Sequence, residues 1–155
     1  MTRTNLILAA TLGSLALLLG AFGFQALGYA PCQMCLWQRY PHAAAILIGL
    51  LALAMPGRIL PLLGALAAFS TAAIGVFHTG VERKWWEGIT SCAGTGDITT
   101  LSATDLLDTS RDLGPPLVKC DEVAWEFLGI SMASWNVLFS LAFVALWLMA
   151  ARRSP

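Results

Sequence analysis

The chain has little charge. Asp, Glu, Lys and Arg make up 12% of its 155 residues, whereas hydrophobic residues make up 57%. A water-soluble domain this poor in charge would expose large apolar patches. The formal net charge is zero, so the basic surplus that nucleic-acid binding requires is missing. The high apolar content also excludes intrinsic disorder. A membrane protein is the class that remains.

Acids are missing from the first half of the chain. Residues 1–80 contain no Asp or Glu, and all nine acids fall between Glu82 and Glu126. Crossing a bilayer core of ~30 Å takes roughly 20 helical residues. Four apolar runs meet that length, at about residues 6–28, 36–55, 59–79 and 132–150, the second only if its polar first turns lie at the interface.

These runs predict an all-α fold. Residues 1–155 form a single integral membrane domain, a four-transmembrane-helix bundle with outer loops at 29–35 and 80–131. A cleaved signal peptide is the alternative for the first run, but that run is longer than the usual apolar stretch of 7–15 residues. Pro31, directly after the small residues where cleavage would fall, also disfavours it.

The charges are divided unevenly between the two sides that four spans create. One side holds both termini and a short turn, and its basic residues, with no acid, sum to +4: Arg3, Arg58, Arg152 and Arg153. The other side holds five basic residues against nine acids, a sum of −4. Basic residues near short loops stay in the cytoplasm. The split therefore predicts cytoplasmic termini and cysteine loops on the outer side, which in a bacterial inner (cytoplasmic) membrane is the periplasm.

The cysteines are few, and none lies within an apolar run. Cys32, Cys35, Cys92 and Cys120 all fall in the outer loops, where disulfides form and persist. The first two form a C-x-x-C motif, a spacing that lowers the thiolate pKa and suits reversible oxidation. Together with the second outer pair, the motif predicts redox chemistry at the membrane surface.

The residues around the motif favour a thiolate. Pro31 before it and helix-forming residues after it predict that Cys35 lies in a first helical turn, where free N–H groups favour an anion. Arg39 follows four residues later, on the same helix face. An arginine so close to an apolar run is costly unless it is paired or solvated. Stabilising the Cys35 thiolate would give Arg39 a function.

Other uses of the cysteines fit less well. A zinc site usually has two close pairs, whereas Cys92 and Cys120 are far apart in sequence, so no metal site is predicted. Covalent haem requires C-x-x-C-H, but Leu36 occupies the histidine position. A merely structural disulfide remains possible for the distant pair.

The long outer loop is expected to carry short interfacial helices. Ser102 with Asp105 favours a helix start, and residues 121–128, ended by Gly129, favour a second helix resting on the bilayer. Trp85 and Trp86 follow the third run directly, where tryptophan usually anchors a span at the interface.

The sequence resembles a known family at this point. The stretch Pro-Cys-Gln-Met-Cys-Leu-Trp-Gln-Arg at residues 31–39, four apolar runs, and two cysteines in the second outer loop are similar to the disulfide bond formation protein B (DsbB) family. The Trp-Glu-Phe-Leu-Gly stretch at residues 125–129 strengthens the resemblance, which covers nearly the whole chain.

The resemblance implies a thiol:quinone oxidoreductase. It would re-oxidise a periplasmic DsbA-like thioredoxin-fold dithiol protein and pass two electrons to membrane quinone, either ubiquinone or menaquinone. By position, Cys92 would take the mixed disulfide with the partner, the freed Cys120 would attack Cys32, and Cys35 would meet the quinone. Because the partner is a strong oxidant, its own acceptor must have a still higher potential.

The resemblance also implies a quinone site and shows one departure. Arg39 matches the family's quinone-site arginine, and His78 matches a histidine that lies near the quinone in some members. Gln38 stands where some members carry Glu, so any role of that carboxylate is in doubt here. The other histidine, His42, is more simply an interface residue.

Two other functions compete with this one. A small scaffold or transporter subunit could use its disulfides only to hold loops together, although the apolar runs lack the acids of an ion path. A quinone-linked enzyme related to vitamin K epoxide reductase would run electrons the other way. The C-x-x-C motif precedes the second run and not the last one, which favours the DsbB-like function.

Overall fold

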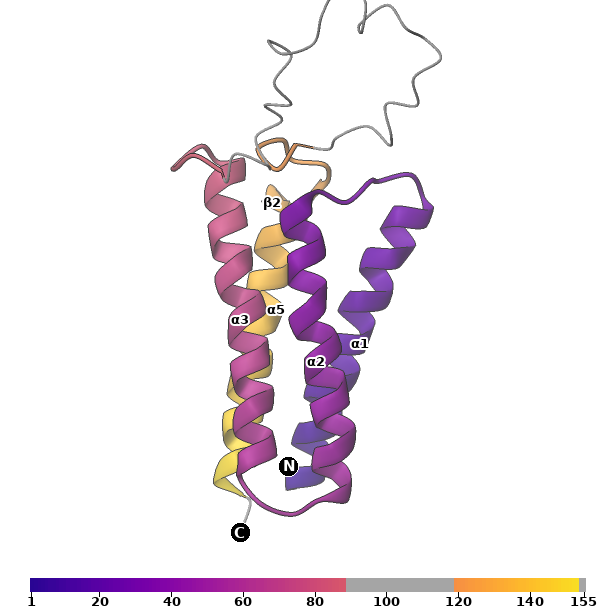
Figure 1. Cartoon of the computed structure of the whole chain (residues 1–155), viewed down its shortest axis with the longest axis vertical. Coiled ribbons are helices and arrows are strands. Elements are labelled where there is room, and N and C mark those ends of the chain that lie inside the picture. Colours follow the sequence, from indigo (N-terminus) through magenta and orange to yellow (C-terminus); the bar gives the residue numbers. More distant parts are fainter. Residues whose placement is uncertain (89–118, 154–155) are drawn as a thin grey trace, which may run out of the picture.

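A computed structural model describes residues 1–88 and 119–153 of the chain (Figure 1). Cys92 and the expected helix near Ser102 lie outside the described residues. The described part contains four long helices and a pair of two-residue strands. They are α1 (Arg3–Ala26), α2 (Gln33–Ala54), α3 (Ile59–Glu82), β1 (Glu126–Phe127), β2 (Ile130–Ser131) and α5 (Met132–Arg152).

The helices form an upright bundle in which each packs against two neighbours. Helix α3 contacts α2 and α5, and α1 contacts the same two helices, which closes the ring. Both chain termini lie at one end of the bundle, and the α1–α2 and α3–α5 connections lie at the other (Figure 1). The second end carries the C-x-x-C motif, because α2 begins there at its N-cap residue, Cys32.

The apolar core fills the half of the bundle near the termini. Trp147 of α5 is fully buried there, and its ring lies where a side chain on Gly64 of α3 would have to sit. Small residues therefore let α3 and α5 approach closely, as in membrane helix pairs. Leucines such as Leu19, Leu47 and Leu66 are at least 60% exposed, a pattern that suits lipid and not water.

Three of the described helices, α1, α3 and α5, are long and apolar enough to cross a membrane. Helix α2 is not among them because polar residues occupy its first turns, among them Gln38, Arg39 and His42. The four helices begin and end within a few residues of the four apolar runs in the sequence. Three candidate spans and the predominantly helical bundle agree with the prediction of a helical membrane protein.

The expected helix over residues 121–128 is wrong. These residues instead form turns and then an antiparallel hairpin in which Glu126 pairs with Ser131 and Phe127 with Ile130. Leu128 and Gly129 form its turn with positive φ angles of 55° and 72°. Glycine readily adopts such angles, so Gly129, expected as a helix end, serves a hairpin turn instead. The tip is apolar, with Leu128 77% exposed.

Candidate functional site

The C-x-x-C motif lies at the N-terminus of α2, as its sequence predicts. Cys32 is the N-cap residue, and its Sγ accepts a hydrogen bond from the Cys35 backbone N–H at 3.3 Å. This contact satisfies one of the free N–H groups of the first turn. The two sulfur atoms lie 3.0 Å apart, with Cys32 as the donor. The pair is therefore arranged for reversible disulfide formation, since a small approach brings the sulfurs to bonding distance.

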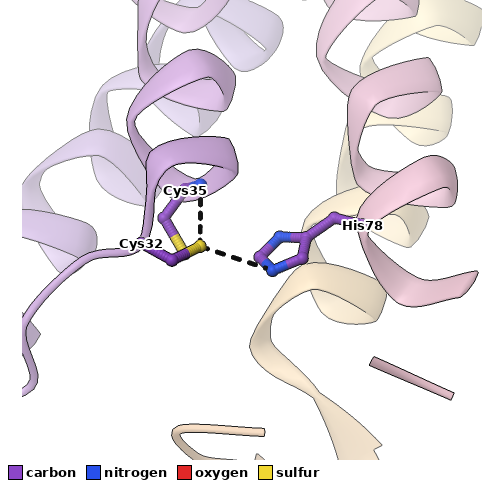
Figure 2. A group of neighbouring side chains, drawn as sticks. All are labelled: Cys32, Cys35 and His78. Carbon is purple, nitrogen blue, oxygen red and sulfur yellow. Dashed lines mark hydrogen bonds between the residues drawn. The ribbon is translucent and has the colours of Figure 1, made fainter. Parts of the chain in front are cut away.

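His78 of α3 faces the cysteine pair from the other side of the bundle interior (Figure 2). Its Nε2 lies 3.5 Å from the Sγ of Cys32, and the ring is only 3% exposed. The same nitrogen lies 3.8 Å from the carboxylate of Glu82, which accepts a hydrogen bond from the Ser131 hydroxyl. Cys32 is thus in contact with a buried imidazole.

A third cysteine joins this cluster. Cys120 is fully buried and packs together with Cys32, Met34 and Val81. Cys32, at 5% exposure, is therefore enclosed between the imidazole of His78 and the loop that carries Cys120. Cys32 and Cys120 belong to the same buried cluster, whereas Cys35 borders it.

Cys35 instead opens onto a cavity of about 420 Å³ between α1, α2, α5 and the hairpin. Its wall is mostly apolar and rich in aromatic rings, including Phe24, Trp125 and Trp135. Phe24 and Trp125 contact each other with ring centroids 5.0 Å apart, which ties α1 to the hairpin segment. Ligand pockets are commonly apolar with a few placed polar groups, and here Cys35 and Arg39 are among those groups.

Arg39 crosses from α2 to α1 at the wall of this cavity. Its guanidinium donates to the Gln25 side chain at 2.7 Å and to the Ala21 carbonyl at 3.2 Å. It also lies over the ring of Phe22, 4.7 Å from the centroid. Its buried Nε has no hydrogen-bond partner within the described residues. Cys35 and Arg39, which the sequence places on one face of the helix, both line the cavity.

The two cysteines hold their protons unequally. Cys35 lies ahead of the apolar part of α2. The hydrogen bond from the Cys32 thiol lowers the pKa of Cys35, and the positive charge of Arg39 acts in the same direction. Burial and the negative charge of Glu82 oppose that decrease. The same hydrogen bond, together with burial, raises the pKa of Cys32 far above its usual range. The first proton therefore leaves Cys35, and the thiolate faces the cavity.

The sequence missed the polar residues that surround this cluster. Gln38 Nε2 lies 2.9 Å from His78 Nδ1, and its Oε1 accepts from Asn136 of α5 at 2.7 Å. Asn136 also bonds Thr71 at 3.1 Å and His42 at 2.8 Å. An amide within an apolar span is a sign of an interhelical contact, so Asn136 was detectable in the last apolar run, although its partners were not.

His78 lies away from the wall that Cys35 and Arg39 share, because the described cavity lining does not include it. With the two cysteine sulfurs it forms a set of three ligand atoms within 4.8 Å of one another. Zinc accepts such ligands, a possibility that the sequence spacing did not suggest. A metal would need the lone pair of Nε2, whereas the hydrogen bond from Gln38 to Nδ1 leaves the proton on Nε2.

A helical membrane bundle that holds a C-x-x-C pair between a third cysteine and an apolar cavity defines a class, the membrane thiol oxidoreductases. The comparison with known proteins identifies the family. Residues 3–150 match the family described as disulfide bond formation protein DsbB, and the chain belongs to this family. The resemblance found in the sequence is thereby confirmed, and the protein is a disulfide-forming membrane oxidoreductase.

Individual relatives agree over nearly the full length. The chain is 30% identical over 154 residues to the disulfide bond formation protein B of Dechloromonas aromatica (strain RCB), covering 88% of this chain and 86% of that protein. It is 31% identical over 153 residues to the protein of the same name from Aromatoleum aromaticum (strain DSM 19018 / LMG 30748 / EbN1), covering 92% and 91%. No solved structure matches the chain significantly.

Proposed function

We propose that the protein is a thiol:quinone oxidoreductase that re-oxidises a DsbA-like dithiol protein of the periplasm. The observation that carries this proposal is the two-sided environment of the cysteine pair. Cys32 faces Cys120 in a closed cluster, whereas Cys35 faces an apolar cavity. A relay needs this separation, because one sulfur must exchange with a protein disulfide while the other meets the electron acceptor.

The residues of the cavity fit a quinone. A quinone has a flat apolar ring that suits aromatic walls, and its carbonyl oxygens accept hydrogen bonds. Arg39 has a buried donor, Nε, without a partner among the described residues. A quinone bound there would be the two-electron acceptor of the reaction. Ubiquinone and menaquinone share this chemistry.

The electrons would come from the partner's dithiol. The partner attacks the Cys92–Cys120 disulfide at Cys92, which frees the Cys120 thiolate. Cys120 then attacks Cys32 of the Cys32–Cys35 disulfide, so that a Cys120–Cys32 bond forms and Cys35 leaves as the thiolate. Over one turnover the partner loses two electrons and two protons in forming its disulfide, and the quinone gains both. The burial of Cys120 against Cys32 supports the second of these exchanges.

The same proposal includes the orientation of the protein in the membrane. Helix α2 would be the fourth span, with its polar first turns and Cys32 at the periplasmic surface. The unequal charges of the two ends favour cytoplasmic termini in the bacterial inner membrane. Both termini lie at the end of the bundle opposite the cysteines, as this orientation requires (Figure 1).

The test is a coupled assay of the purified protein in detergent. Reduced DsbA-like protein and a soluble ubiquinone or menaquinone analogue are added, and quinone absorbance and free thiols are followed together. We expect one quinone to be reduced for every two thiols lost. Thiol loss without quinone reduction, or reduction of quinone without the dithiol protein, would overturn the proposal.

The lowered pKa of Cys35 gives a pH-dependent prediction. In the reduced protein its thiolate should persist below the free-cysteine pKa of about 8.5, so alkylation should slow only as the pH falls through the lowered value. Cys32, whose pKa is raised, should stay unreactive over that range. Iodoacetamide labelling at a series of pH values, read by mass spectrometry, measures both. A Cys35 midpoint at or above that of free cysteine contradicts the assignment.

A further inference from the structure

The buried polar residues form a chain of hydrogen bonds whose direction is fixed at one end. The Thr71 hydroxyl donates to the backbone carbonyl of Gln38 at 3.2 Å. Its single proton is then in use, so its oxygen can only accept from Asn136, whose Nδ2 lies 3.1 Å away. The amide of Asn136 is thereby oriented, with its nitrogen toward α2 and α3. Its Oδ1 faces the Nε2 of His42 at 2.8 Å, as that orientation requires.

The orientation of Asn136 determines that of Gln38. Asn136 Nδ2 also donates to Gln38 Oε1 at 2.7 Å, which turns the Gln38 nitrogen away toward α3. An independent contact gives the same answer, because Gln38 Nε2 donates to the Met34 carbonyl at 3.3 Å. A carbonyl oxygen has no proton to give, so the amide of Gln38 cannot be reversed without losing both bonds.

The orientation of Gln38 determines the tautomer of His78. Gln38 Nε2 lies 2.9 Å from His78 Nδ1 and carries the proton of that bond. A neutral imidazole with an accepting Nδ1 has its own proton on Nε2. This nitrogen lies 3.5 Å from the Cys32 sulfur (Figure 2). His78 therefore meets Cys32 as a donor.

Cys32 now has two donors and one acceptor around its sulfur. The His78 ring and the Cys35 backbone N–H both point at it. Its own proton is left for the Cys35 sulfur, 3.0 Å away. Two N–H groups directed at one sulfur align the S–H toward the remaining neighbour, and linked hydrogen bonds of one direction strengthen one another.

We propose that Gln38 holds His78 in the tautomer with its proton on Nε2, and that this N–H makes the Cys32 thiol a stronger hydrogen-bond donor to the Cys35 thiolate, which stabilises the single negative charge of the reduced cysteine pair. The inference rests on the proposed function, in which Cys35 is the sulfur that meets the quinone. It gives His78 a catalytic contact with a reacting sulfur and makes Gln38 a positioning residue. It also assigns a use to the amide at position 38, where the resemblance implied a carboxylate in some members.

Other titratable groups near the cluster do not replace His78 in this arrangement. Glu82 lies 3.8 Å from the same nitrogen, farther than Cys32, and is bonded by the Ser131 hydroxyl. Cys120 packs against Cys32 from the loop side. Arg39 lies on the cavity side, where its charge favours the Cys35 thiolate. All of these groups are present in every variant below except where one is changed on purpose.

Exchanging the amide for a carboxylate should reverse the tautomer. In Gln38→Glu, one oxygen can still accept from Asn136, but the other has no proton for His78 Nδ1 and accepts one instead. The proton then moves to Nδ1, and Nε2 presents a lone pair to Cys32. The side chain keeps its length, so the packing is conserved while the direction of the hydrogen bond between residue 38 and His78 is inverted.

Nitrogen NMR of the reduced protein with ¹⁵N-labelled histidine reads this directly, because the chain has only two histidines. His42→Gln assigns the two sets of signals. We expect His78 to be protonated at Nε2 in the natural sequence and at Nδ1 in Gln38→Glu. Glu82→Gln, which removes the nearby charge, should leave the natural tautomer in place. A His78 protonated at Nδ1 in the natural sequence overturns the proposal.

A second readout separates the donor from bulk and charge. His78→Phe removes the N–H without adding charge and should raise the pH midpoint of Cys35 alkylation by about one unit, the effect of losing one hydrogen bond that stabilises an ionised pair. His78→Gln can place an amide N–H near the Cys32 sulfur and should restore much of the lower midpoint. An unchanged midpoint in His78→Phe, or zinc binding to the reduced pair through His78, overturns the proposal. Neither readout requires quinone reduction, so a failure of the proposed function is detected separately.

Discussion

Cys35→Ser removes quinone reduction, with an expected fall of about 1000-fold or more in turnover. Cys35 is the one thiol that lines the cavity in the described part of the chain. A serine hydroxyl in its place neither ionises near neutrality nor forms the disulfide that releases two electrons. The measurement is the coupled assay of quinone absorbance and thiol loss, with excess reduced partner protein.

Cys32→Ser is the matched variant, because it makes the same atomic change one helical turn away. It should also block turnover, yet it leaves the Cys35 thiol on the cavity wall and therefore reactive toward alkylating agents. In Cys35→Ser the remaining Cys32 is 5% exposed and should react slowly. Both variants should unfold in detergent near the temperature of the natural sequence. Quinone reduction by Cys35→Ser at the natural rate would refute the assignment of Cys35.

The helices were predictable because the bilayer imposes their length. Uncharged runs of about 20 residues marked α1, α3 and α5, and the polar first turns of α2 were visible in the sequence. The hairpin at residues 126–131 was not predicted, because a short alternating stretch does not distinguish a helix on the bilayer from a strand pair. Its turn depends on positive φ angles at Leu128 and Gly129, of which only the glycine is a clear signal.

The C-x-x-C pair, Arg39 and their shared face followed from helix periodicity within α2. The partner of His78 did not, because it depends on how α3 packs against α2. The sequence suggested a quinone contact for His78, and the structure puts its ring against Cys32. That contact and the amide of Gln38 arise only when three helices meet, since Asn136 of α5 completes the chain.

In the proposed function, the arrangement as a whole separates two kinds of chemistry across one helix turn. Thiol–disulfide exchange needs contact with another sulfur, and the loop that carries Cys120 supplies it at Cys32. Electron transfer to a lipid-soluble acceptor needs an apolar, water-poor surface, which the cavity supplies at Cys35. The helix N-terminus serves both sulfurs, because Cys35 lies in its first turn and Cys32 caps it.

Arg39→Met should raise the apparent KM for quinone by roughly 10–100-fold, the equivalent of a lost hydrogen bond from a charged donor of about 1.5–3 kcal/mol. The Arg39 guanidinium donates to Ala21 and Gln25 of α1. Its Nε has no hydrogen-bond partner within the described residues and can therefore donate to a ligand. Methionine keeps much of the side-chain length but carries no donor and no charge. The cysteine pairs should still form their disulfides, which thiol titration checks.

Two further variants separate charge from geometry at this position. Arg39→Lys keeps the positive charge near Cys35 but has a single ammonium in place of the guanidinium fork. It should therefore keep the low alkylation midpoint of Cys35, while the apparent KM for quinone is raised as in Arg39→Met. Arg152→Met removes an exposed arginine at the opposite end of the bundle and should leave the KM unchanged. An unchanged KM in Arg39→Met would mean that the acceptor binds elsewhere. A lost disulfide in that variant would instead assign Arg39 to the thiol chemistry, and either result contradicts its role as a quinone ligand.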